Sequence, residues 1–246
     1  MNLLLLFDQD FLPDGTVILR GRRALHAHKV LGANAGDALR VGRWRGLKGR
    51  GRVLESTAEL LHLAVELTEP PPPKLGIDVL LAIPRPKALR KVLPALTSLG
   101  VGRIVLVNAA KVEKSYFTSK VLSLDALKDA VTLGLEQSED TQPPVIAIKE
   151  LFRPFVEDEL AAVFKDAKKL LAHPGAERQV PDLVFEAHAQ KVVLAIGPEG
   201  GWAPFELELL NSVGFTAFSL GQRTLRVEVV LPFALGQLQA KRALSP

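Results

Sequence analysis

The stretches IGPEGGW (residues 196–202) and LGQRTLRVE (residues 220–228) determine the predicted fold of this chain. Each stretch follows an apolar run and precedes a helical pattern, so each predicts a strand that ends in a glycine-opened loop before a helix. Glycines let the backbone approach a ligand closely, and free N–H groups at a helix start hold anions. Taken singly, the first loop is compatible with a plain strand-to-helix turn and the second with a salt-bridged helix start.

Outward from these loops, the chain after residue 74 alternates strands with helices. Strands buried on both faces and alternating with helices predict an α/β domain with a mainly parallel sheet. Ligands of such sheets bind at the carboxyl ends of the strands, which is where both loops lie. The expected strands span 77–83, 103–108, 145–148, 169–173, 191–196 and 216–220, and the expected helices span 88–99, 125–138, 156–167, 205–213 and 227–243.

The four prolines at 70–73 mark a domain boundary, because consecutive prolines fit neither a helix nor a central strand. The preceding part has short strands, a helical turn and turn signals at the spacing of a small β-barrel. We therefore expect a front domain over 1–68 and a second domain over 74–246. In the front domain the expected strands span 16–19, 38–41, 51–54 and 61–67, with a helical turn over 26–31 and a Gly/Arg loop over 42–50.

Positive charge is concentrated in the front domain. The segment 20–52 holds ten Lys or Arg residues and one acidic residue, Asp37. Such a block is the footprint of a protein that contacts a phosphate backbone, although a solvated basic surface has the same composition. Trp44 lies inside the block and fits either a base-stacking role or a buried position in the barrel.

Composition excludes several classes of protein. The chain of 246 residues has 48% hydrophobic residues and no cysteine, so it is ordered and has neither disulfides, thiolate metal sites nor a cysteine nucleophile. No apolar run reaches the roughly 18 residues of a membrane span. The apolar run that opens with Leu3–Leu6 stops at Asp8, and no basic region precedes it. This pattern favours a buried strand over a signal peptide. We expect a cytoplasmic protein.

The two decisive stretches resemble a known family when they are taken with other short motifs. They are similar to the Ile-Gly-Pro-Glu-Gly-Gly and Leu-Gly-x-Arg-x-Leu-Arg-x-Glu-Thr elements of the ribosomal RNA small subunit methyltransferase E family in the SPOUT superfamily. The resemblance covers nearly the whole chain. Further matches are His173-Pro174, Glu136-Gln137-Ser138, Leu99-Gly100-Val101, and His26 to Leu31 followed by Gly36-Asp37.

The resemblance implies a PUA-like β-barrel joined to a SPOUT domain with a deep trefoil knot. It also implies S-adenosylmethionine as the cofactor, a homodimer, and methylation of N3 of a uridine in 16S rRNA, either naked or within the 30S subunit. The implied cofactor-binding residues are Leu171, His173, Gly197, Pro198, Glu199, Gly200, Gly201, Leu220, Gly221, Leu225 and Arg226.

Two of these residues are also candidates for the chemistry. Arg226 would stabilise a uridine anion, and Glu199 would accept the N3 proton directly or through water. The target base must leave its stack to reach such a site, so an unpaired nucleotide is expected. The residues expected to hold the RNA backbone are Arg20, Arg22, Arg23, Arg43, Arg45, Lys48, Arg50, Arg52 and Arg223.

The chain departs from the family pattern at several positions. The Arg-rich opening is replaced by Leu3–Leu6, the Lys-Gly-x-Lys/Arg stretch by Arg85-Pro86-Lys87, and two threonines by Val227 and Val229. These departures suggest that the target nucleotide differs from the family's usual one. Two other readings stay open, namely a SPOUT ribose 2′-O-methyltransferase and a non-catalytic RNA-binding or ribosome-assembly factor.

Overall fold

A computed structural model describes residues 2–187 and 189–244. The chain forms two compact units, and each is described by itself. The front unit consists of Met1–Pro73 together with Val131–Pro143, and the second unit consists of Lys74–Ala130 and Pro144–Pro246. No pattern in the sequence indicated that the short segment 131–143 belongs with the front unit.

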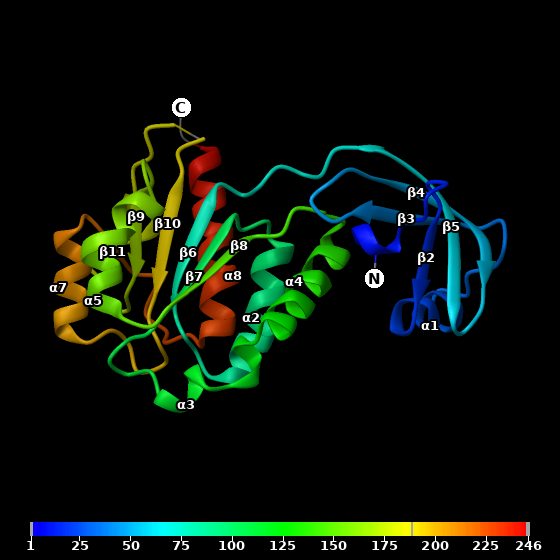
Figure 1. The fold of residues 1–246 in the computed structure, drawn as a ribbon. Helices are drawn as coiled ribbons and strands as arrows, with labels where there is room; N and C mark the ends of the chain where they lie inside the picture. The colour runs from blue at the N-terminus through cyan, green and yellow to red at the C-terminus, as the bar shows by residue number, and fades with distance from the viewer. Residues whose placement is uncertain (1, 188, 245–246) are drawn as a thin grey trace. The chain divides into compact units, whose positions relative to one another are not determined.

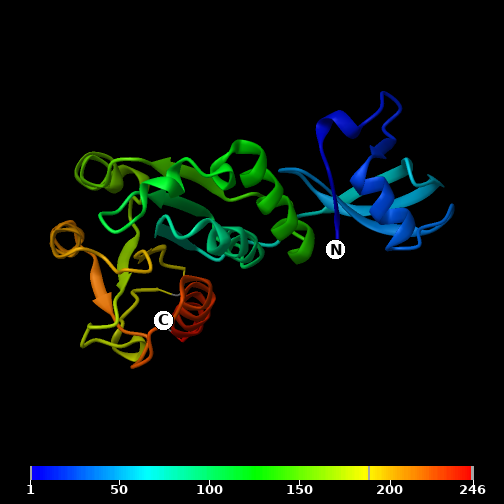
Figure 2. The ribbon, with the colours of Figure 1, turned by 90° about the horizontal axis from the view of Figure 1, so that it is seen from below.

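The front unit is built on a five-stranded sheet that curls into a nearly closed, barrel-like shape. One helix, α1 (Arg22–Lys29), lies against this sheet and is seen beside the strands in Figure 2. Ala24 and Ala27 of α1 are fully buried, because only small side chains fit between the helix and the strands. The strand order is β1 (Leu4–Leu6), β3 (Ala38–Arg43), β4 (Lys48–Ser56), β5 (Leu60–Glu69) and β2 (Val17–Arg20), and a short 3-10 turn, η1, spans Asp8–Asp10.

Two expectations for the front unit were wrong in extent. The expected helical turn over 26–31 is a two-turn helix that begins four residues earlier, at Arg22. The expected Gly/Arg loop over 42–50 is mostly strand, because β3 continues to Arg43 and β4 begins at Lys48. Gly49 lies within β4, and this position requires glycine because a Cβ there would clash with the carbonyl oxygen of Glu66 on the paired strand β5.

Helix α4 (Leu124–Ser138) contributes a buried acidic side chain to the front unit. Glu136 is 3% exposed, and its Oε1 accepts a hydrogen bond of 3.3 Å from the backbone N–H of Leu5. Burial raises the pKa of the Glu136 carboxyl above its usual value, although the Leu5 hydrogen bond and the nearby Arg22 and Arg23 act in the opposite direction. The folded front unit therefore holds a proton on Glu136 more tightly than the unfolded chain does.

We expect Glu136→Gln to make the protein relatively more stable as the pH rises. A raised folded-state pKa means that the contribution of Glu136 to stability is full below the unfolded pKa and is lost as the pH rises through the folded pKa. Glutamine keeps the acceptor for Leu5 and cannot ionise. Denaturant unfolding should show that the free energy of unfolding of the variant, relative to the wild type, is higher at pH 7 than at pH 4. The control Asp129→Asn, on the exposed side of α4, should show no such change with pH. A Glu136→Gln difference that is the same at both pH values would contradict the prediction.

The second unit contains a six-stranded sheet in which every neighbouring pair is parallel. The predicted α/β class with a mainly parallel sheet is confirmed, and Figure 1 shows the strands of this sheet side by side. Because all strands run the same way, their carboxyl ends meet at one edge. The order is β11 (Thr216–Phe218), β9 (Lys168–Ala172), β10 (Val192–Ile196), β6 (Ile77–Ala82), β7 (Arg103–Val107) and β8 (Val145–Lys149).

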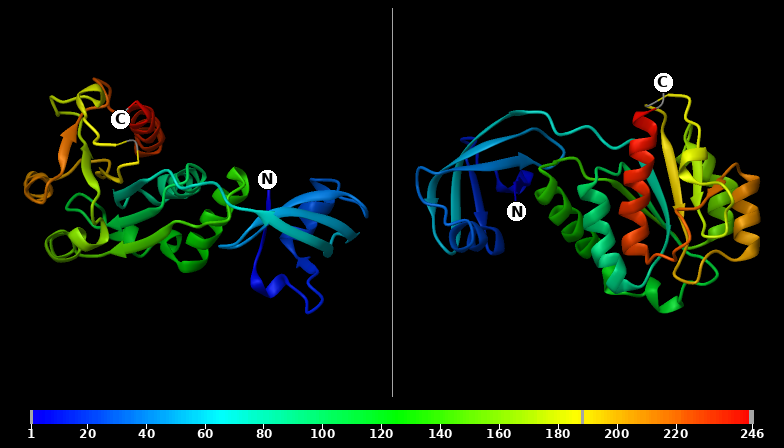
Figure 3. Two further views of the ribbon diagram at one scale, coloured as in Figure 1. Left: turned by 90° about the horizontal axis from the view of Figure 1, so that it is seen from above. Right: turned by 180° about the vertical axis from the view of Figure 1, so that it is seen from behind.

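The central strands β10 and β6 are almost entirely apolar, since both of their faces are covered, and Asp78 of β6 is the one charged residue in them. Every residue of β10 is buried, and α2 and α8 lie side by side over the sheet (Figure 3). Within the described residues, no helix is long and apolar enough to cross a membrane. The helices are α2 (Pro86–Ser98), α3 (Lys114–Phe117), α5 (Phe152–Pro154), α6 (Leu160–Val163), α7 (Pro204–Ser212) and α8 (Val227–Ala243), with a π-helical stretch, η3 (Phe155–Glu159), and 3-10 turns η2 (Lys120–Leu122) and η4 (Val180–Asp182).

The helix expected over 156–167 was misplaced by about one turn. The helical segment begins at Phe152 and ends at Val163, with Phe152 and Phe155 buried at its start. The chain then adopts a left-handed conformation at Asp166, with φ +59°, which ends the helical path before β9.

Candidate functional site

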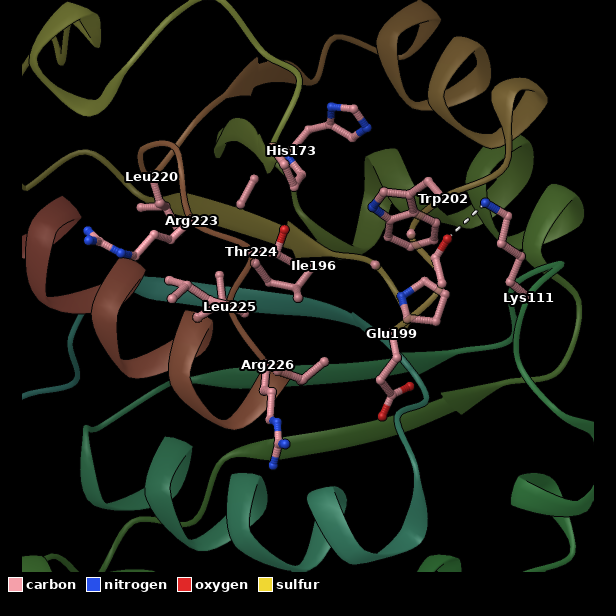
Figure 4. A pocket seen from close by; sticks show the side chains of 18 of the residues that line it. Lys111, His173, Ile196, Glu199, Trp202, Leu220, Arg223, Thr224, Leu225 and Arg226 are labelled. Carbon is pink, nitrogen blue, oxygen red and sulfur yellow. Dashed lines mark hydrogen bonds between the residues drawn. The ribbon is translucent and has the colours of Figure 1, made fainter.

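A pocket lies at the carboxyl ends of β9, β10 and β11 and is closed on one side by the start of α8. Its volume is about 530 Å³, within the range of small-molecule sites. Figure 4 shows its walls, which the two glycine loops predicted from the sequence supply in large part. The lining residues are Lys111, Ala172, His173, Pro174, Ile196, Gly197, Pro198, Glu199, Gly200, Gly201, Trp202, Leu220, Gly221, Arg223, Thr224, Leu225, Arg226, Val227 and Val230.

Glycines are required in these loops by backbone shape and by packing. Gly201 and Gly221 have φ values of +71° and +115°, a region that side chains disfavour. A Cβ on Gly197 would come within 3.1 Å of the Trp202 ring, which packs against the backbone there. These glycines therefore leave backbone without side chains in the two loops that line the pocket.

A fully buried carboxylate joins two of the loops beside the pocket. Glu206, in the first turn of α7, has an exposed fraction of 0%. Its Oε2 accepts the N–H of Ala203 at 2.7 Å, and its Oε1 accepts the N–H of Ala110 at 2.7 Å. Ala203 follows the first glycine loop, whereas Ala110 follows β7, so one side chain fixes two loops that are distant in sequence.

Two further contacts hold the first glycine loop to its neighbours. The Nζ of Lys111 donates a hydrogen bond of 2.8 Å to the carbonyl oxygen of Gly200 (Figure 4). The Oε1 of Glu199 accepts the N–H of Arg85, in the loop after β6, at 3.0 Å. Glu199 therefore has a structural contact in addition to the role predicted for it.

The two residues predicted to act in catalysis lie on the same side of the pocket. Arg226 is the exposed N-cap residue of α8, and in Figure 4 its side chain and that of Glu199 point away from His173. Arg223 extends on the other side, past Leu220. Among the described residues, neither arginine forms an ion pair with a carboxylate. Both cations therefore remain available to a ligand.

Most of the residues predicted to bind a cofactor line this one pocket, and Leu171 does not. Leu171 is fully buried within β9 and belongs to the core, so only the next residues of the chain reach the cavity. His173 lines the pocket, and its Nδ1 accepts the N–H of Gly175 at 3.1 Å, which fixes the turn after β9. His173 therefore lines the pocket and stabilises the turn after β9.

The sequence interpretation missed three lining residues that carry polar groups, namely Lys111, Trp202 and Thr224. Lys111 follows β7 in a stretch without a motif, so no pattern indicated it. Thr224 lies within the second glycine loop and Trp202 is the last residue of the first, which was a usable signal. The Trp202 ring lies 5.6 Å from that of Phe152, and its buried Nε1 has no hydrogen-bond partner among the described residues. An unpaired buried donor is costly and suits a site that receives a polar ligand.

The residues expected to hold RNA, apart from Arg223, lie in the front unit. Three are ion-paired: Arg23 with Asp10 at 2.6 Å, Arg43 with Asp8 at 3.0 Å, and Lys48 with Glu69 at 3.9 Å. Asp10 is buried, so Arg23 balances a buried negative charge in the front unit. The others, Arg20, Arg22, Arg45, Arg50 and Arg52, are exposed.

In the described part of the chain, no group of three or more His, Asp or Glu side chains is arranged to hold a metal ion.

Comparison with known proteins agrees with this combination of fold and pocket. The RNA methyltransferase domain family matches residues 71–239. Ribosomal RNA small subunit methyltransferase E of Treponema pallidum is 30% identical over 239 residues, which is 93% of this chain and 86% of that protein. The enzyme of the same name from Synechocystis is 28% identical over 92% of this chain and 74% of its own length.

Solved structures share the fold over the whole chain. A Legionella pneumophila methyltransferase with bound S-adenosylmethionine has a TM-score of 0.77 at 23% identity, covering 97% of each chain. The Neisseria gonorrhoeae ribosomal RNA small subunit methyltransferase E, also bound to S-adenosylmethionine, has a TM-score of 0.75 at 20% identity, covering 98% of this chain and 97% of that one.

The parallel sheet with its pocket at the carboxyl edge defines the class, that of α/β proteins which bind a small ligand where the strands end. The chain belongs to the RNA methyltransferase domain family and, within it, to the ribosomal RNA small subunit methyltransferase E family.

Proposed function

We propose that the protein transfers a methyl group from S-adenosylmethionine to N3 of a uridine in 16S rRNA. The observation that carries the proposal is the pocket, whose walls are the two loops that identify the family. The names of the curated relatives support a small-subunit rRNA substrate. The methylated atom rests on the resemblance of residues 196–202 and 220–228 to the family motifs.

The residues of the pocket fit this cofactor. Ile196, Leu220, Leu225 and Val230 give apolar surface for an adenine ring, and the bare backbone of the glycine loops provides donors and acceptors for polar edges. Cations at Lys111, Arg223 and Arg226 suit a carboxylate, and Trp202 brings an unpaired N–H. The cofactor would lie among these groups. When bound, S-adenosylmethionine supplies an electrophilic methyl group on a sulfonium, which requires no metal.

The side chains at the pocket wall have two tasks in this reaction. N3 of uridine carries a proton that must leave, and the base then gains negative charge on its ring and carbonyl oxygens. Arg226 would stabilise that charge, because its guanidinium is always protonated. Glu199, already held by the N–H of Arg85, would accept the proton directly or through water. Glu206 and Lys111 would hold the loop that presents Glu199.

We further propose the finer features that the resemblance implies, namely a PUA-like front domain that binds RNA, a trefoil knot around the pocket loops, and a homodimer. Exposed cations such as Arg50 and Arg52 on β4 support RNA binding by the front unit. Val229 and Phe233 support dimerisation, since they stand one turn apart on α8 and are 46% and 45% exposed.

The test is a transfer assay with labelled S-adenosylmethionine and, separately, naked 16S rRNA and 30S subunits. Digested RNA is then analysed for methylated nucleosides. Label in 3-methyluridine is the expected result and identifies the particle that serves as substrate. Label in a ribose-methylated nucleoside would replace the proposal with 2′-O-methylation. Cofactor binding without transfer to either RNA would favour a non-catalytic assembly factor.

A further inference from the structure

The second unit contains a segment in which basic residues far outnumber acidic residues. Residues 85–120 contain eight Lys or Arg residues and a single acidic residue, Glu113. The rest of the second unit, 74–84, 121–130 and 144–246, contains 13 basic and 15 acidic residues. The cations are therefore segregated within this unit, which a solvated surface of mixed charge does not require.

Seven of the eight cations belong to two neighbouring elements. They lie on the first half of α2 and on the loop that carries α3 and η2, and η2 packs against α2. Figures 1 and 3 show the start of α2 beside α3. We call this surface the α2–α3 cation surface; its exposed members are Arg85, Lys87, Arg90, Lys91, Lys111, Lys114 and Lys120.

These cations lack partners of opposite charge. Within the described residues, none of the seven forms an ion pair with a carboxylate. The one carboxylate of the segment, Glu113, accepts a hydrogen bond of 2.9 Å from the hydroxyl of Tyr116. In the front unit, by contrast, three of the predicted RNA contacts are matched by Asp or Glu.

The placement of Lys87 also opposes the local rule for helix stability. It lies in the first turn of α2, where the helix dipole favours acids, and that turn contains no acidic residue. Lys87 and Lys91 are four residues apart, and like charges at this spacing repel. A surface that accepts such unfavourable charge without compensation indicates a polyanionic ligand.

The surface continues into the wall of the pocket. Lys111 donates to Gly200 of the first glycine loop, and the backbone of Arg85 donates to Glu199. From these contacts we infer that the α2–α3 cation surface binds the phosphate backbone of the RNA strand whose target base enters the pocket. The inference rests on the proposed function and adds to it a docking surface on the second unit itself.

The test compares pairs of neutral substitutions that lie outside the pocket. Lys87→Gln with Lys91→Gln removes two charges on α2, and Lys114→Gln with Lys120→Gln removes two on the loop. The matched control, Lys165→Gln with Lys191→Gln, removes two exposed charges elsewhere in the same unit. Affinity for a short uridine-containing single-stranded RNA is measured over a range of salt concentrations, and affinity for S-adenosylmethionine is measured by calorimetry.

Each of the two pairs of substitutions on the α2–α3 cation surface should weaken RNA binding about 10-fold at low salt. Each pair should also reduce the slope of log K against log salt concentration by about 1.4, at roughly 0.7 per phosphate contact. The control pair and the cofactor affinity should stay near wild type. Equal slopes for the test and control pairs would overturn the inference, as would absence of RNA binding by the wild type. Loss of binding to 30S subunits but not to RNA would replace RNA with a ribosomal protein. Failure of methyl transfer, with these RNA results intact, would count only against the proposed function.

Discussion

Arg226→Gln is expected to lower the kcat of methyl transfer by about 100- to 1000-fold, the usual loss when a charge-stabilising group is removed from a transition state. Arg226 is exposed at the pocket wall, lacks a carboxylate partner among the described residues, and points to the same side as Glu199 (Figure 4). Glutamine keeps a hydrogen-bond donor, on a shorter side chain, and removes the charge. Steady-state kinetics with saturating cofactor and RNA would measure the loss.

Two companion variants make this expectation specific. Arg223→Gln alters the other pocket arginine, which extends on the opposite side, and should raise the KM for RNA while leaving kcat within a few-fold of wild type. Arg226→Lys keeps the charge without the planar fork and should recover part of the rate. An Arg226→Gln enzyme with normal kcat would show that Arg226 takes no part in charge stabilisation.

The sequence predicted the pocket better than it predicted the barrel, and the difference has a physical cause. Loops 196–202 and 220–228 depend on local backbone shape, because positive φ at Gly201 and Gly221 admits few residues besides glycine. Such a requirement is visible in a single stretch of chain. The strands β3 and β4 depend instead on pairing, and Gly49 reads as a loop residue until the carbonyl of Glu66 is seen against it.

Contacts between distant segments were also invisible in the sequence. Glu206 lies in the helix predicted over 205–213 and was not singled out, although it joins the loops of Ala203 and Ala110. A count of charged residues over the whole domain did not reveal the α2–α3 cation surface, because the acidic residues after residue 120 balance its positive charge. The segment 131–143 could not be assigned to the front unit, because only its contacts place it there.

Glu206→Gln is expected to destabilise the second unit by about 2–3 kcal/mol and to lower the affinity for S-adenosylmethionine. Glu206 is fully buried, and each carboxylate oxygen accepts one backbone N–H at 2.7 Å. An amide has a single acceptor oxygen, so its NH₂ group must face either Ala110 or Ala203. That N–H is then buried without an acceptor, which costs roughly 1–3 kcal/mol in addition to the lost charge-assisted bond.

The loss of this contact should reach the pocket, because Ala203 immediately follows Trp202 and because Ala110 precedes Lys111, whose Nζ holds Gly200. We expect the melting temperature to fall by roughly 5–10 °C, at about 2–4 °C per kcal/mol for a chain of this size. Calorimetry should show cofactor affinity reduced about 10-fold while kcat at saturation is largely kept, since Glu206 is a positioning residue. Glu208→Gln, an exposed change two residues further along α7, is the matched control and should alter neither quantity. A Glu206→Gln protein that binds the cofactor as the control does would show that the two loops hold their positions without this carboxylate.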